Sequence, residues 1–268
     1  KNRFLATMSH EMRTPLHGML GITRMLQRAP ANAPPAERER QLVTLERAGE
    51  HLLALITDVL DFSRIESGQL RLATAPFDLA ALVADVGELT QVSGRDKGLA
   101  VAVVGPLDGP CWVHGDAARL RQVLINLTGN AVKFTDQGTV TLSLARRADG
   151  LTVLQVSDTG PGIAPDDLGR VVEAFHQGDG GPMRRHGGTG LGLAIARELV
   201  RLMHGELDGA NLPTGGACFS LRLPLPACAA PVQATPEPAH RLAGRVLLVE
   251  DNPVNAMVAE AMLARAGL

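Results

Sequence analysis

Two long apolar stripes near the start of the chain constrain its fold more than any other feature. Between positions 5 and 26, apolar side chains recur every three or four residues, the spacing of an amphipathic helix with a coiled-coil-like seam. A second stripe runs from Leu42 to Phe62, inside a stretch of helical spacing from about Glu37 to Ile65. Three prolines in "APANAPPAE" break the pattern between them. The sequence therefore predicts an αα-hairpin over residues 1–70.

A single hairpin has too little surface to bury both of its apolar stripes. Two hairpins packed together as a four-helix bundle bury all of them. We therefore expect this all-α region to form a homodimer.

Beyond Gly68 the pattern changes to alternating strands and helices. Residues 71–226 are expected to form a mixed α/β sandwich. The predicted strands are 70–73, 99–104, 139–145, 151–158 and 217–225, and the predicted helices are 78–89, 116–134 and 191–204.

The last part of the chain is expected to begin another domain. Residues 227–243 are rich in proline and alanine and are typical of a linker. Residues 244–268 contain "GRVLLVEDNPVN", which predicts one buried strand and one helix.

The composition argues against two broad classes of function. The 268 residues carry a net charge of −2, whereas a general nucleic-acid binder needs a basic excess. Aromatic residues are only 3%, which disfavours base-stacking platforms.

The cysteines and the apolar runs bear on the compartment. Three scattered cysteines without metal spacing favour a reducing compartment such as the cytoplasm. No apolar run approaches the roughly 20 residues that span a bilayer. The chain opens with "KNRF" and no methionine, as a piece cut from a longer protein would. We expect it to be the cytoplasmic portion of a protein anchored in the inner membrane.

"NLTGNAVKF" places two amides on one face of a predicted helix. Asn126 and Asn130 are four residues apart, and their oxygens can help hold Mg²⁺, which keeps most of its shell as water and phosphate. Lys133 lies one turn beyond Asn130 and can reach a phosphate. The alternatives are a helix cap, a polar face or a glycosylation sequon at Asn126.

"VSDTGPGI" ends a predicted strand with Asp158. The glycines Gly160 and Gly162 let the backbone pass close to a flat ligand, and a buried carboxylate there can accept a hydrogen bond from the exocyclic amine of adenine. An ordinary turn after a strand fits the same residues.

"HGGTGLGLAIARELV" is a glycine-rich segment that opens a helix. Backbone N–H groups at such a helix start can cradle phosphates. The glycine spacing is not that of a dinucleotide fingerprint, and no lysine follows a glycine as a P-loop requires. The preceding "GDGGPMRRHGG" is typical of a mobile lid.

The order of these motifs resembles that of the bacterial hybrid sensor histidine kinases, over nearly the whole chain. "FLATMSHEMRTPL" matches the family's H box, "NLTGNAVKFT" the N box, "DTGPGI" and "GGTGLGL" the glycine boxes, and "EAFHQ" the F box. "VLLVEDNPVN" resembles the opening of a receiver domain of flavodoxin-like fold. The catalytic segment resembles the nucleotide fold that these kinases share with type II topoisomerases and Hsp90 chaperones.

The resemblance implies an ATP-dependent protein-histidine kinase that uses ATP and Mg²⁺. Asn130 would be the main Mg²⁺ ligand with Asn126 assisting, and Asp158 would bind the adenine amine. The other implied nucleotide contacts are Lys133, Gly160, Gly162, Phe175, Gly188, Thr189, Gly190 and Leu191. Arg184 and Arg185 in the lid either stabilise phosphate charge or are simply solvated.

His10 has chemistry that suits a phosphoryl acceptor. A neutral imidazole nitrogen can attack the γ-phosphoryl group of ATP while Glu11 accepts the proton from the other nitrogen. Taken alone, His10 is more simply a solvated helix residue, and only the nucleotide motifs downstream favour the catalytic interpretation. Thr14 matches the threonine that the family is implied to use in dephosphorylating its receiver partner. Pro15 is expected to kink the helix there.

Glu250 and Asp251 follow the predicted strand "RVLLV" and form an acidic pair suited to Mg²⁺. An acidic turn that caps the next helix is the alternative. In the family, the phosphate-accepting aspartate of the receiver lies further along, beyond Leu268.

Two other functions compete with the kinase. A conformational ATPase of the same fold would carry a glutamate to activate water where this chain has Asn126. A non-catalytic dimeric scaffold would bind nucleotide or partner proteins without chemistry.

Overall fold

The computed structural model describes residues 2–28, 34–106, 109–147, 150–169, 190–231, 246–251 and 253–265. The chain divides into two compact units, Lys1–Ala230 and Pro231–Leu268.

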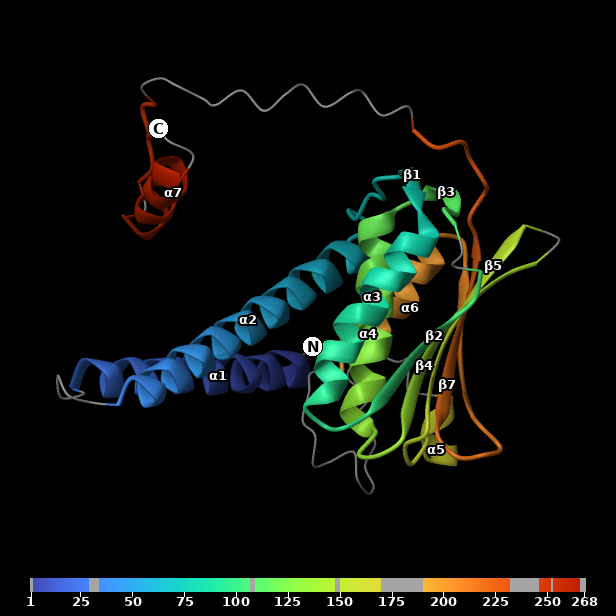
Figure 1. Cartoon of the computed structure of the whole chain (residues 1–268), viewed down its shortest axis with the longest axis horizontal. Coiled ribbons are helices and arrows are strands. Elements are labelled where there is room, and N and C mark those ends of the chain that lie inside the picture. Colours follow the sequence, from blue (N-terminus) through green and yellow to red (C-terminus); the bar gives the residue numbers. More distant parts are fainter. Residues whose placement is uncertain are drawn as a thin grey trace. The chain divides into compact units, whose positions relative to one another are not determined.

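The first unit begins with the predicted helical hairpin. Helices α1 (Asn2–Arg28) and α2 (Pro35–Glu66) pack against each other (Figure 1). Pro35 occupies the first turn of α2, where a proline costs no hydrogen bond because that N–H lacks a helical partner. Helix α1 continues through Pro15, so the proline does not end it.

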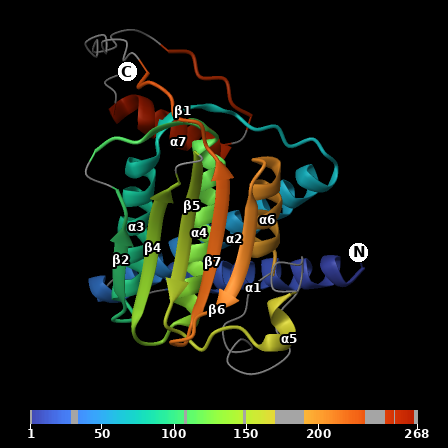
Figure 2. The same cartoon turned by 90° about the vertical axis from the view of Figure 1, so that its right-hand side faces the viewer.

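A five-stranded sheet forms the centre of the α/β region (Figure 2). Its strand order is β2–β4–β5–β7–β6, with only the β2–β4 pair parallel. The strands are β2 (Ala100–Val104), β4 (Thr139–Arg146), β5 (Leu151–Asp158), β6 (Glu206–Asn211) and β7 (Ala217–Pro224).

Three helices cover one face of this sheet (Figure 1). They are α3 (Leu79–Arg95), α4 (Ala117–Phe134) and α6 (Gly192–Leu202). Alternate residues of β4, β5 and β7 are buried against them, as the period of a strand requires for a one-sided sheet. Asp78 and Asp116 accept backbone N–H groups as N-caps of α3 and α4. The predicted α/β sandwich is therefore confirmed.

A small antiparallel ladder lies beside the main sheet. Strands β1 (Ala75–Asp78) and β3 (Trp112–Gly115) pair with each other, and Val113 also forms a bridge with Ala227. The chain thus enters and leaves the α/β region on either side of β3.

Three strands of the α/β region were not foreseen, and one strand predicted for this region is wrong. No strand forms over residues 70–73; the extended segment that finds a partner is β1, a few residues later. Alternating apolar residues favour a strand, but a strand exists only where a neighbour accepts its hydrogen bonds. Strands β1, β3 and β6 are short or polar, and the sequence pattern does not predict them.

Short helix α5 (Pro165–Leu168) follows the loop after β5. In the second unit, helix α7 (Pro253–Arg265) forms as predicted. The expected buried strand before it is wrong for residues 246–250, which have no strand and expose Leu247 and Val249. No described residues pair with that segment. Over the parts of the chain that the structure describes, no helix has the length and apolarity needed to cross a bilayer.

Candidate functional site

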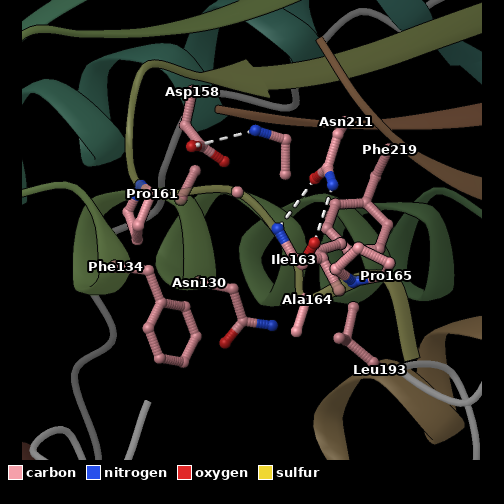
Figure 3. A pocket seen from close by; sticks show the side chains of 13 residues that line it. Asn130, Phe134, Asp158, Pro161, Ile163, Ala164, Pro165, Leu193, Asn211 and Phe219 are labelled. Carbon is pink, nitrogen blue, oxygen red and sulfur yellow. Dashed lines mark hydrogen bonds between the residues drawn. The ribbon is translucent and has the colours of Figure 1, made fainter. Parts of the chain in front are cut away.

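A cavity of about 440 Å³ opens between α4, α6, the loop after β5 and the β6–β7 hairpin (Figure 3). This volume lies within the range of small-molecule sites. Its walls are largely apolar, formed by residues that include Ala131, Phe134, Pro161, Ile163, Leu193 and Phe219. Asn130, Asp158 and Asn211 are the polar residues with side chains in its lining.

Asp158 presents a carboxylate at this cavity. It is 8% exposed, and its Oδ1 accepts hydrogen bonds from the N–H groups of Gly160 at 2.9 Å and Ala217 at 3.2 Å. The other oxygen, Oδ2, has no hydrogen-bond partner among the described residues. A fixed carboxylate with one unused acceptor is suited to binding an N–H donor of a ligand.

The glycines after Asp158 allow close packing of the loop. A Cβ atom on Gly160 would lie 2.9 Å from the carbonyl oxygen of Phe134. Gly162 has a φ of +73°, and a Cβ there would lie 2.9 Å from Asn211 Oδ1. Only glycine avoids both the contact and the strained backbone. Of the two, Gly162 lines the cavity.

Asn130, Lys133 and Asn126 project from α4 into different surroundings. Asn130 lines the cavity, and its amide makes no hydrogen bond to another described residue. Lys133 Nζ lies 5.1 Å from the centroid of the Phe134 ring. Burial lowers the pKa of Lys133, and the charge of Glu11 partly offsets this. Asn126 is not in the cavity lining; its Nδ2 donates to the carbonyl of Gly192 at 3.2 Å.

The C-terminal end of α4 is held by a lysine from outside the helix. Lys97 Nζ donates to the carbonyl oxygens of Val132 and Lys133 at 2.8 Å and of Thr135 at 3.3 Å. A cation at a helix C-terminus satisfies carbonyls that lack helical partners and interacts favourably with the helix dipole. The end of α4 nearest Asn130 is thereby fixed.

The N-terminal part of α1 lies close to this region. Met8 is 4% exposed and belongs to the same core cluster as Leu127 and Ile195. Glu11 is half-buried, and its charge raises the pKa of Lys133, while Thr14 is exposed. Position 10 lies in α1, but the side chain of His10 falls outside the described part of the structure.

Helix α2 is tied to the other end of α4. Arg119 Nη1 lies 2.7 Å from Asp61 Oδ2, and Gln122 Nε2 donates to the same oxygen at 2.8 Å. Asp61 is 3% exposed, so this carboxylate depends on those donors. Burial and the charge of Asp61 raise the pKa of Asp58, one turn earlier, to about 6.

Several predicted site residues lie away from the cavity or outside the described residues. Phe175, Gly188 and Thr189 fall outside the described residues, as do Arg184 and Arg185. Gly190 has a φ of +66° before α6, and Leu191 is fully buried in the core.

Glu250 and Asp251 belong to the second unit, where Asn255 Nδ2 donates to Glu250 at 3.3 Å. The described ranges contain no group of three His, Cys, Asp or Glu residues placed to hold a metal ion.

Asn211 was not predicted as a site residue, but its side chain faces the cavity and bonds to the Ile163 backbone (Figure 3). The surrounding "ANLPTGGA" is typical of a hairpin turn, and an asparagine there is explained by the turn alone. Nothing in the local sequence indicates that this side chain contacts a loop 48 residues away.

Two family models match the chain, and together they cover more than half of it. The "His Kinase A (phospho-acceptor) domain" matches residues 1–68. The "Histidine kinase-, DNA gyrase B-, and HSP90-like ATPase" matches residues 115–227, which include the cavity.

Curated relatives and solved structures agree with these matches. The autoinducer 2 sensor kinase/phosphatase LuxQ of Vibrio cholerae is 39% identical over 99% of this chain and 32% of its own length. The sensor protein TorS of Escherichia coli K12 is 42% identical over 100% of this chain and 29% of its own. Full-length ShkA, solved in complex with AMPPNP, has a TM-score of 0.63 and 40% identity, covering 86% of this chain and 47% of that one. The chain thus spans about a third or less of these two curated relatives.

Proposed function

We propose, from the premise that this chain belongs to the histidine kinases, that it uses ATP to phosphorylate His10 and passes the phosphoryl group to an aspartate of a receiver domain. The observation that carries the proposal is the cavity at which Asn130, Asp158 and Gly162 meet. These residues come from two motifs separated in sequence. Their convergence on one apolar cavity with an unused carboxylate oxygen fits an adenine base.

The cavity chemistry suggests how the nucleotide is held. Asp158 Oδ2 would accept the exocyclic amine of adenine, while the apolar walls contact the flat faces of the ring. Lys133, close to the cavity residue Phe134, would bind phosphate oxygens. The fall in its pKa on burial would be reversed by phosphate charge, which favours the ammonium form.

The donor chemistry of the site fits Mg²⁺ bound mainly by water and phosphate. Asn130 offers an unpaired amide at the cavity, and the described residues hold no acidic cluster that would make an all-protein metal site. When bound, Mg²⁺ would neutralise phosphate charge during transfer. The Asn126 amide, which bonds to Gly192, would assist from a greater distance.

The transfer step requires two groups on α1, one to accept the phosphoryl group and one to accept a proton. A neutral nitrogen of His10 would form a bond to the γ-phosphorus as the bond from that phosphorus to the β,γ-bridging oxygen breaks and ADP leaves. Glu11 would accept the proton from the other ring nitrogen. The charge of Glu11 acts on Lys133, the proposed phosphate contact, and this supports the role. Thr14 would orient water when the receiver is dephosphorylated.

Incubation with γ-labelled ATP and Mg²⁺ tests the proposal. The chain should retain an acid-labile, base-stable label that His10→Gln and Asn130→Asp abolish. His17→Gln is the matched control, because His17 is an exposed histidine on the same helix, and it should label normally. Label retained by His10→Gln would refute the assignment.

The same experiment separates the two competing functions. Free phosphate without protein label would indicate a conformational ATPase, and neither product would indicate a scaffold. Asn126 favours the kinase over the ATPase, because an amide cannot act as the base that activates water.

A homodimer is also part of the proposal. Both hairpin helices expose apolar side chains, and those of α2 include Leu53 and Leu60; this favours a homodimer through the hairpin. Glutamate at both positions should shift the chain towards monomer in analytical ultracentrifugation; an unchanged sedimentation coefficient would oppose a dimer through this face.

We retain as proposals the division into 1–70, 71–226, 227–243 and a receiver start at 244–268. Glu250 and Asp251 would then help bind Mg²⁺ in the receiver. Sensor or membrane segments upstream, with this portion in the cytoplasm, complete the proposed arrangement.

A further inference from the structure

We infer that Asn211 is a positioning residue for the nucleotide site, holding the loop from Gly160 to Ala164 in the conformation that accepts the base. The inference rests on the proposed function, because it concerns the same cavity. Asn211 acts through the loop and is not assigned to the chemistry of transfer.

The contact between Asn211 and the loop is reciprocal (Figure 3). The N–H of Ile163 donates to Asn211 Oδ1 at 2.7 Å, and Asn211 Nδ2 donates to the carbonyl of Ile163 at 2.6 Å. Two bonds of opposite direction to one residue fix both the position and the orientation of its backbone. The side chain of Ile163 is 6% exposed and forms part of the cavity wall.

The loop is also held at its other end, so that the contacts close into a ring that includes residues lining the cavity. Asp158 Oδ1 accepts the N–H of Gly160 and the N–H of Ala217. Ala217 in turn is the register partner of Asn211 in the β6–β7 pair. Asp158, the loop, Asn211 and Ala217 therefore constrain one another. Release of the Ile163 contact would open the ring at one point.

The amide of Asn211 is not needed to form the hairpin that carries it. The β6–β7 turn is closed by its own backbone, with Leu212 N donating to Gly216 O at 2.9 Å and Gly215 N to Leu212 O at 3.0 Å. Asn211 is an exposed residue at the end of the edge strand. Its loss should therefore free the loop and leave the fold intact, which separates a positioning role from a structural one.

The test measures the initial rate of His10 labelling against ATP concentration for the whole chain. Asn211→Ala should raise the half-saturating ATP concentration about five- to tenfold, with the maximal rate within about twofold of the wild type. Asn211→Asp should show a similar rise, because it keeps the shape and the acceptor but loses the donor to the Ile163 carbonyl. Gln155→Ala is the matched control: it removes an exposed amide bonded to Ser220, and it should change neither quantity.

Three results would overturn the inference. These are an unchanged half-saturating concentration in Asn211→Ala, a fall in maximal rate alone, or wild-type behaviour of Asn211→Asp, which would mean that only shape matters. Calorimetric affinity for ADP gives a readout independent of phosphotransfer. If the wild type binds ADP without labelling, the proposed kinase step fails, and the ADP affinities of the variants still decide the role of Asn211. If the wild type neither labels nor binds ADP, both fail.

Discussion

The helical hairpin and the α/β region differ in how far they bury their apolar side chains. In α4, Leu120, Leu124 and Leu127 are fully buried, whereas Leu53 and Leu60 of α2 are 66% and 52% exposed. The α/β region completes its core within one chain. The hairpin helices also carry apolar residues at helical spacing, but no described residues cover Leu53 and Leu60 of α2. Strong amphipathic spacing therefore predicts a helix without specifying what will cover it.

The C-terminal part of α2 is the exception. Leu55 and Asp61 are buried there, and Val59, Phe62 and Ile65 pack against the core cluster. In this part the hairpin uses the α/β region as its partner. Contacts in this part of α2 should therefore respond to mutation as core contacts do, and those further towards its N-terminus should not.

The largest effect should come from the core itself. Leu124→Ala should lower the free energy of unfolding by about 3–4 kcal/mol, since it leaves a cavity in a fully packed site. Leu53→Ala, at an exposed position, should change it by no more than about 0.5 kcal/mol. Urea unfolding at low protein concentration measures both. Equal losses would show that the hairpin face is as well covered as the core.

The next effect concerns two arginine–aspartate pairs of similar length and different burial. Arg119→Ala leaves Asp61, 5% exposed in its side chain, with one donor fewer, and should cost about 2–3 kcal/mol. Arg121→Ala breaks a 2.8 Å pair with Asp85, whose side chain is 57% exposed, and should cost less than about 0.5 kcal/mol. Thermal unfolding compares them. A similar loss in both would mean that α2 is not docked at Asp61.

The pH dependence of stability reports on the same part of α2, through Asp58 and its neighbour Asp61. The pKa of Asp58 is raised from 3.8 to about 6, so the folded chain binds this proton more tightly than the unfolded chain. The free energy of unfolding should therefore fall as pH rises between these two values and stay lower above pH 6.

Asp58→Asn should remove this decline. Because Asp58 is partly solvated, we expect the variant to be more stable at neutral pH by only about 1 kcal/mol. Unfolding curves across this pH range would check it. Parallel pH profiles for the variant and the wild type would contradict the buried setting of Asp58.

The smallest effect is expected at the C-terminal end of α4. Lys97→Met removes the ammonium that three carbonyls share and should cost about 0.5–1 kcal/mol. Arg95→Met is the control, because the guanidinium group of Arg95 makes no hydrogen bond to another described residue. Amide hydrogen exchange over residues 130–135 should accelerate only in the Lys97 variant.

The sequence predicts an element or a site residue correctly where the residues that determine it are close together in the chain. Periodicity predicts both hairpin helices, and alternating residues predict β4, β5 and β7. The motifs that hold Asn130 and Asp158 predict two residues that the fold brings to one cavity. The resemblance to histidine kinases is confirmed by the family matches.

The remaining features depend on contacts that are distant in sequence. Asn211 meets Ile163 across 48 residues, and Arg119 meets Asp61 across 58. Each of these residues fits a simpler local interpretation, as a turn or a solvated helix face. The strand expected at 70–73 is absent for a related reason. Its local pattern favours a strand, but no described strand pairs with these residues.

The ladder around β3 brings together the two ends of the α/β region. Because β1 pairs with one side of β3 and Ala227 bridges to it, the incoming and outgoing backbones of the α/β region are neighbours. A module with adjacent ends can be excised and grafted onto another helical stalk, or closed by a short loop into a circular permutant, without crossing its own core. Such a permutant, opened at the β4–β5 turn, should keep the cavity and its affinity for ADP.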